Sequence, residues 1–201
     1  MHQTPIAMTP ESFLSGLTWP AYVANMEVNR EQAAKLYAEI VLAPEDRHAF
    51  AQAVARHGGQ LYVAALVEDW CGDVVVNLPL LARLAVEVPG IDLSLFVRSS
   101  NPDLAQAYAE QGISSMPVLS FFDADFAEVG RWVERPAAAQ GWVQAWMAAY
   151  PQAEAWRQSS QPEDRRAYRA LLKERLVDMI EWYQQNAWQS TLDELKTLLL
   201  G

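Results

Sequence analysis

The sequence predicts an α/β fold, in which one mixed sheet is covered by helices on both faces. Short apolar runs of strand length alternate with longer stretches of helical length between residues 60 and 150, in the order β-α-β-α-β-β-α. A parallel β-α-β start followed by a closing antiparallel hairpin is typical of such a sheet. Residues 1–59 and 151–201 have helical patterns. We therefore expect an N-terminal helical extension at 1–59, a core at 60–150 and a C-terminal helical extension at 151–201.

The N-terminal extension contains three helix signals. Thr9 is a good N-cap, and Pro10 follows it at the first helical position. Apolar residues recur with helical spacing between residues 29 and 41. Pro44 with two acids starts a third helix, which the glycine pair at residues 58 and 59 ends.

The core contains four strands and three helices. Strands are expected at residues 61–67, 92–97, 117–122 and 126–132, and helices at 73–88, 101–112 and 135–150. The C-terminal extension is helical from Pro162 to Leu200, with an apolar face that includes Leu176, Met179 and Tyr183. Thr191 to Glu194 has the pattern of a capping box, which predicts that a last helix begins there.

Composition excludes several classes of function. The chain has 201 residues, one cysteine and a formal net charge of −10. One cysteine excludes an intramolecular disulfide, a Cys-rich zinc site and a dithiol redox cycle within the chain. An acidic surface repels phosphate backbones and anionic lipid, so we expect neither nucleic acid nor a membrane as a partner. Residues 1–10 lack the features of a signal peptide, and with one cysteine this favours a cytoplasmic protein.

The one cysteine lies at a junction between a predicted strand and a predicted helix. Cys71 falls between the first predicted strand and the helix after it, where free backbone N–H groups and the helix dipole favour a thiolate. It is therefore a candidate nucleophile, and the alternative is a small buried apolar residue. Asp73 either stabilises the first helical turn or handles a proton beside the thiol. Glu68 and Asp69 are expected to be solvated surface charges.

Four features around Cys71 resemble the thioredoxin superfamily. Trp70-Cys71-Gly72-Asp73-Val74 resembles the active-site pattern Trp-Cys-Gly-Pro-Cys of thioredoxins. Pro79 lies inside the following helix at the offset of the family's kink proline, and Gly130 lies near a typical family glycine. Met116-Pro117 resembles the family's cis-proline segment. The chain is similar to a bacterial thioredoxin-like group that has the motif Glu-Asp-Trp-Cys-Gly-Asp. Members of this group carry extra terminal helices. The resemblance therefore implies a thioredoxin-like core with added N- and C-terminal helices.

The sequence also departs from the thioredoxin pattern at three positions. The family's second, resolving cysteine aligns with Val74, and the proline between the two cysteines aligns with Asp73. The buried acid of the dithiol cycle aligns with Ala65. These departures put ordinary thioredoxin activity in doubt.

The resemblance implies a monothiol protein that exchanges thiols and disulfides and takes part in redox homeostasis. Cys71 would be the nucleophile with Asp73 as a second catalytic residue, and the substrate would contact Trp70, Gly72, Met116 and Pro117. Partners would be protein thiols or disulfides, or a low-molecular-weight thiol, and no cofactor or metal is expected.

Two alternatives stay open at this point. One is a non-catalytic binding module for a protein or peptide, in which the terminal helices form the interface. The other is an iron–sulfur carrier in which two chains share a cluster with glutathione. A second copy of the chain, in a homodimer, is a further candidate partner.

The tryptophans and histidines outside the segment around Cys71 give no signal of a binding or metal site. Trp142 and Trp146 are four residues apart on one helix face, which favours core packing against the sheet. His2, His48 and His57 have no metal-ligand spacing.

Overall fold

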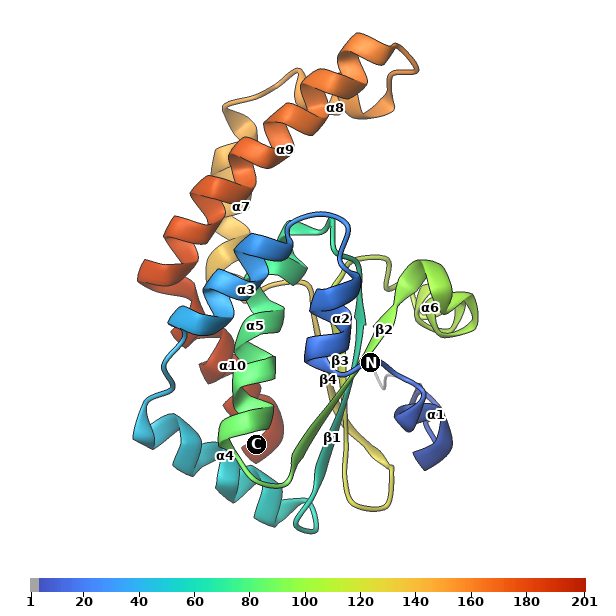
Figure 1. Cartoon of the computed structure of the whole chain (residues 1–201), viewed down its shortest axis with the longest axis vertical. Coiled ribbons are helices and arrows are strands. Elements are labelled where there is room, and N and C mark those ends of the chain that lie inside the picture. The colour runs from blue at the N-terminus through green and yellow to red at the C-terminus, as the bar shows by residue number, and fades with distance from the viewer. Residues whose placement is uncertain (1–3) are drawn as a thin grey trace. The chain divides into compact units, whose positions relative to one another are not determined.

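The protein contains a four-stranded mixed sheet (Figure 1). The computed structural model describes residues 4–201. The strands are β1 (Leu61–Val67), β2 (Ile91–Val97), β3 (Val118–Phe122) and β4 (Glu128–Val133), in the spatial order β2-β1-β3-β4. β1 pairs parallel with β2 and antiparallel with β3, and β4 pairs antiparallel with β3. The α/β fold predicted from the sequence is confirmed.

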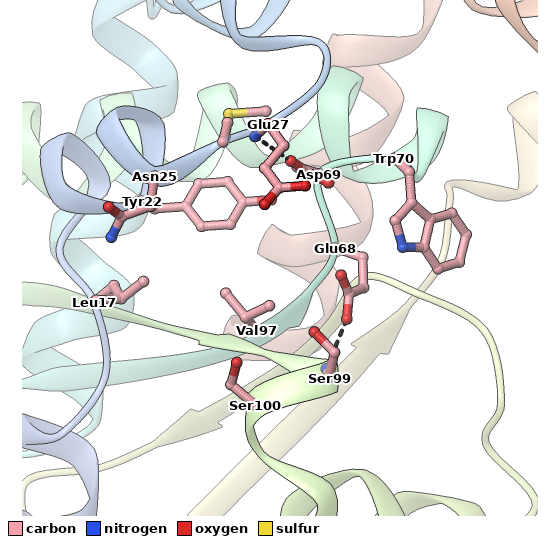
Figure 2. A pocket seen from close by; sticks show the side chains of 11 residues that line it. Leu17, Tyr22, Asn25, Glu27, Glu68, Asp69, Trp70, Val97, Ser99 and Ser100 are labelled. Atoms are coloured by element: carbon pink, nitrogen blue, oxygen red, sulfur yellow. Dashed lines mark hydrogen bonds between the residues drawn. The ribbon is translucent and has the colours of Figure 1, made fainter.

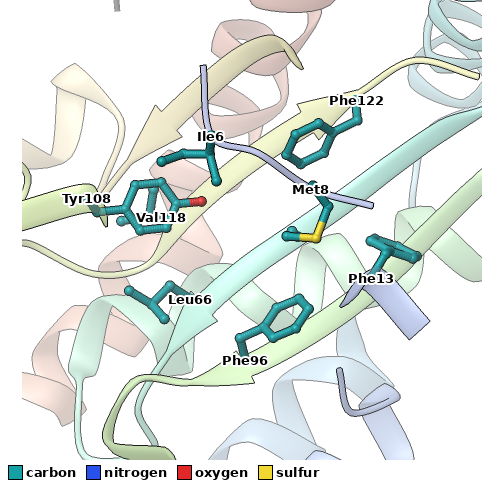
Figure 3. Packing of buried hydrophobic residues seen from close by; sticks show 9 residues of the cluster. Ile6, Met8, Phe13, Leu66, Phe96, Tyr108, Val118 and Phe122 are labelled. Carbon is teal, nitrogen blue, oxygen red and sulfur yellow. The ribbon is translucent and has the colours of Figure 1, made fainter. Parts of the chain in front are cut away.

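Helices cover both faces of this sheet. α5 (Gly72–Glu87) crosses from β1 to β2 on one face, and η1 (Arg98–Ser100) and α6 (Pro102–Ala109) lead from β2 towards β3 on the other, as Figure 1 shows. Side chains of β1 alternate between the faces. Ala64 and Leu66 join Tyr108 of α6 in a buried cluster that also contains Ile6, Met8, Phe13, Phe96, Val118 and Phe122 (Figure 3).

Four helices precede the sheet in the chain. They are α1 (Pro10–Leu14), α2 (Trp19–Asn25), α3 (Arg30–Glu39) and α4 (Pro44–Arg56). Thr9 caps α1 as expected, and its side chain accepts from the Ser12 amide. Between α1 and α2, the backbone of Leu17 exchanges hydrogen bonds of 2.8 and 2.9 Å with Leu95. This bridge covers the outer edge of β2 and ties the N-terminal helices to the sheet.

The last helix of the chain packs on the sheet. The C-terminal segment of α10 (Trp188–Leu200) covers β4 where Gly130 has no side chain, since a Cβ at residue 130 would lie 2.8 Å from Leu198. Trp132 Nε1 donates to Glu194 at 2.8 Å, and Lys196 Nζ donates to buried Asp46 at 2.7 Å. The segment therefore completes the core.

The chain divides into two compact units, residues 1–134 with 192–201, and residues 135–191. The boundaries expected at residues 59 and 150 stay predictions. The second unit contains α7 (Ala137–Ala148), α8 (Ala153–Gln158) and α9 (Pro162–Trp182), which continues through a π-helical turn (Tyr183–Ala187) into α10. Trp142 stacks on Trp182, and Trp146 stacks on Tyr150. The ring partners of both tryptophans thus belong to this unit, where we expected the sheet.

Two expected element boundaries are wrong. The capping box at Thr191 does not begin a helix, because the backbone stays helical from α9 through α10 and the Thr191 hydroxyl donates to the Ala187 carbonyl. β4 begins at Glu128 rather than at residue 126, because Phe126 adopts a left-handed φ of 61° in the preceding turn. Across residues 4–201, no helix combines the length and the apolar character needed to cross a membrane.

Candidate functional site

Cys71 is the N-cap of α5, at the end of the loop that follows β1. Its carbonyl accepts the first helical hydrogen bond, from the Val75 amide at 3.0 Å. Its side chain is half-buried, and Sγ lies 3.5 Å from the Met116 carbonyl oxygen, to which the thiol donates. The fold thus brings the predicted nucleophile against the predicted Met116-Pro117 segment.

The Met116-Pro117 segment precedes β3 and is buried at both residues. The peptide bond between Met116 and Pro117 is cis. The Pro117 carbonyl accepts from the Glu134 amide at 2.8 Å, so the end of β4 holds the segment in place. The Met116 carbonyl, in contrast, faces the thiol.

The residues after Cys71 turn into the core. Gly72 begins α5 and is partly exposed, whereas Asp73 is only 3 % exposed in the first turn. Val74, which occupies the position of a resolving cysteine, is 1 % exposed. Pro79 lies inside α5 and is buried, as the sequence predicted. The Asp73 side chain therefore lies in the protein interior rather than in open water.

Trp70 is the opposite case, because its side chain is 61 % exposed directly before the thiol. Figure 2 shows the indole extending away from the loop at one side of a hollow. A second hollow, of about 600 Å³ and lined by Arg98, Pro102 and Gln106 among others, also borders Trp70. Trp70 thus separates two concave surfaces and is open to a partner on both sides.

Glu68 and Asp69 are not solvated surface charges, so that expectation is wrong. Glu68 is 7 % exposed, and its Oε1 accepts from the Ser99 amide at 2.7 Å. Asp69 Oδ2 accepts from two amides of the α2–α3 turn, Glu27 at 2.7 Å and Val28 at 3.1 Å. The two carboxylates accept hydrogen bonds from backbone N–H groups of neighbouring segments, which would otherwise be unsatisfied. These bonds fix the loop that carries Trp70 and Cys71.

A pocket of about 410 Å³ lies on the side of Trp70 that faces α2, and we call it the Tyr22 pocket (Figure 2). The α2 segment, the loop after β1 and the end of β2 all contribute to its wall. Its lining residues are Leu17, Tyr22, Asn25, Met26, Glu27, Glu68, Asp69, Trp70, Val97, Ser99 and Ser100. Trp70 is the one lining residue that the sequence predicts as a site residue, because no motif links α2 to residues more than 40 positions away.

Tyr22 has an unusual environment within this pocket. Its side chain is 3 % exposed, and its buried hydroxyl has no hydrogen-bond partner among residues 4–201. Burial raises the pKa of Tyr22 above its ordinary value, and the nearby charges of Asp69, Glu68 and Cys71 raise it further. The phenol therefore keeps its proton at neutral pH.

The histidines lie in other surroundings. His48 Nε2 contacts the Gln52 side-chain amide, and His57 Nε2 contacts the Leu199 carbonyl. His2 lies outside the described residues. Within residues 4–201, no group of three or more His, Cys, Asp or Glu side chains could hold a metal ion.

A family model described as thioredoxin matches residues 16–149, which is more than half of the chain. The chain belongs to the thioredoxin family. This confirms the superfamily suggested by Trp70-Cys71-Gly72, whereas membership of the Trp-Cys-Gly-Asp group stays a prediction. No curated protein matches this thioredoxin-family chain.

Two solved structures are similar to this thioredoxin-family protein. One is a protein of unknown function from Pseudomonas aeruginosa, with 22 % sequence identity and a TM-score of 0.54. The other is an HIV epitope scaffold, with 22 % identity and a TM-score of 0.53. Each match covers 90 % of this chain and 100 % of the other chain. At this identity the similarity supports the fold alone.

Proposed function

We propose that the protein exchanges thiols and disulfides through the single thiol of Cys71, in a cytoplasmic setting. The observation that carries the proposal is the position of Cys71, half-buried at the N-terminus of α5 with Sγ 3.5 Å from the Met116 carbonyl. A helix N-terminus stabilises an anion, and a partly exposed thiol can reach a substrate. Family membership supports the same chemistry at this position.

The exchange needs no cofactor. Cys71 loses its proton to solvent, and the thiolate attacks one sulfur of a disulfide. A bond forms between Sγ and that sulfur, while the second sulfur leaves as a thiolate. A low-molecular-weight thiol, or a thiol of a protein partner, then attacks the mixed disulfide and releases Cys71. Each step exchanges one thiol for another, so no further oxidant or reductant is consumed.

The surroundings of Cys71 support roles for its neighbours. Trp70 and Gly72 flank Cys71 in the chain, and Met116-Pro117 is the segment that the thiol contacts, so we propose that all four residues contact the substrate. Val74 cannot resolve a mixed disulfide, so the second thiol must come from another molecule. A carboxylate disfavours a nearby thiolate, and Asp73 lies two residues from Cys71 with its side chain buried. We propose that Asp73 restrains the thiol until a substrate binds.

Two reactions test this proposal. Glutathione disulfide should add one glutathione to the protein, observed by intact mass, and Cys71→Ser should abolish the adduct. Asp73→Asn should raise the alkylation rate of Cys71 at pH 7 by roughly three- to tenfold, because a repelling charge is removed. An unreactive Cys71 in both assays would overturn the proposal. A slower reaction in Asp73→Asn would instead make Asp73 a proton acceptor.

A non-catalytic binding module is the second candidate. The exposed Trp70 between two hollows favours it, because such a surface can hold a partner without chemistry. For a binding module, Cys71→Ser retains every partner that the native protein captures, whereas Trp70→Ala loses them. For an exchange protein, Cys71→Ser loses the covalent partners.

A further inference from the structure

The Tyr22 pocket carries negative charge on several sides. Three carboxylates line it, those of Glu27, Glu68 and Asp69, and none of its described lining residues is Lys, Arg or His. Backbone amides hold Glu68 and Asp69 in position through Oε1 and Oδ2 respectively. A carboxylate offers about four acceptor sites, so these two retain acceptor capacity toward a ligand.

The Tyr22 hydroxyl supplies an independent observation. Buried hydroxyls are paired in the large majority of folded proteins, because an unpaired one lowers stability. The Tyr22 hydroxyl is buried without a partner among the described residues, on a side chain that lines the pocket. Figure 2 shows the ring lying across the pocket wall with the hydroxyl directed toward Glu27 and Asp69. A ligand with N–H donors would satisfy the phenol oxygen.

We infer that the Tyr22 pocket binds an organic cation, an ammonium or guanidinium group carried by a small thiol or disulfide. An ammonium group can donate to the Tyr22 oxygen and to a carboxylate at the same time. The exposed Trp70 ring adds a face that attracts cations. Three carboxylates repel an anion, and residues 4–201 contain no group suited to a metal ion.

The size and place of the pocket define the substrate class. A volume of about 410 Å³ lies within the roughly 300–1,000 Å³ range of small-molecule sites. Trp70 lines the pocket and directly precedes Cys71 in the chain, and the charge of Cys71 acts on Tyr22, so the pocket lies near the thiol. The assignment of this cation to a substrate rests on the proposed function. The pocket selects disulfides and thiols with a positive charge near their sulfur.

Binding can be tested without the thiol. In Cys71→Ser, S-methylcysteamine should bind at least about tenfold more tightly than 2-(methylthio)ethanol, which replaces the ammonium with a hydroxyl. Shifts of backbone amide signals in NMR spectra measure both affinities. Glu27→Gln and Tyr22→Phe should each weaken the binding of S-methylcysteamine by roughly two- to tenfold. Glu45→Gln, an exposed charge on α4 outside the pocket lining, is the matched control.

The results separate the pocket from a general charge effect. Equal affinities for the two compounds, or an equal loss in Glu45→Gln, would overturn the inference. Tyr22→Phe should also raise the melting temperature, because it removes the unpaired hydroxyl. Weaker binding in a more stable variant cannot be explained by unfolding.

Exchange kinetics distinguish the failure of this inference from the failure of the proposed function. The native protein should react at least about tenfold faster with cystamine, a dication, than with hydroxyethyl disulfide, which is neutral. Binding of S-methylcysteamine without any exchange would overturn the proposed function and keep the cation site. Equal exchange of both disulfides without ammonium binding would overturn the cation site and keep the proposed function.

Discussion

Replacing Asp69 with alanine tests whether this carboxylate positions the loop of the thiol. The substitution removes two hydrogen bonds, from the amides of Glu27 at 2.7 Å and Val28 at 3.1 Å. Hydrogen bonds to charged groups contribute about 1.5–3 kcal/mol each, and water compensates part of the loss at this exposed turn. We expect the free energy of unfolding to fall by about 2 kcal/mol, measured by urea denaturation at pH 7.

Asp123 provides a matched control for this experiment. Its Oδ1 accepts from the amides of Asp125 at 3.0 Å and Ala127 at 2.9 Å, in the β3–β4 turn. Asp123→Ala should lower stability by a similar amount, but only Asp69→Ala should change the alkylation rate of Cys71. If the alkylation rate of Cys71 is unchanged in Asp69→Ala, or changes equally in Asp123→Ala, a positioning role for Asp69 is refuted.

Three further outcomes are expected. Burial raises the pKa of Tyr108 to about 12, so the unfolded chain ionises this phenol near pH 10 and the folded protein does not. Between these two pH values the free energy of unfolding should therefore fall by about 1.4 kcal/mol per pH unit. Urea titrations should show that Tyr108→Phe removes this pH-dependent contribution. Gly130→Ala places a Cβ 2.8 Å from Leu198 and should lower the free energy of unfolding by about 1–3 kcal/mol. Amide hydrogen exchange in α10 should become faster, and an unchanged exchange rate would contradict this contact. Val74→Cys should form a disulfide with Cys71 on mild oxidation, seen as a mass loss of two hydrogens, and two persistent free thiols would argue against a thioredoxin-like geometry.

The sequence allowed the sheet and the place of the thiol to be predicted. Strands such as β1 are short apolar runs bounded by breaking residues, and this signal is local. Cys71 and Met116-Pro117 could be paired because a known family shows the same segments in the same order. The resemblance therefore supplied the long-range part of the prediction.

The roles of Glu68, Asp69 and Tyr22 could not be predicted in this way. Their partners or neighbours lie on segments distant in the chain, such as the Ser99 amide for Glu68 and the α2–α3 turn for Asp69. An acid in a loop has the same local pattern whether water or a backbone amide surrounds it. Only the fold shows that these two carboxylates are partly or fully buried.

The position of α10 has a consequence for synthesis. Lys196 and Leu199 contact Asp46 and His57, which the ribosome makes some 140–150 residues earlier. Until the final helix has emerged, β4 is uncovered at Gly130, and its apolar surface is open to other chains. Nascent chains that end before residue 192 therefore lack this cover, and partly folded chains with exposed apolar surface are prone to aggregate.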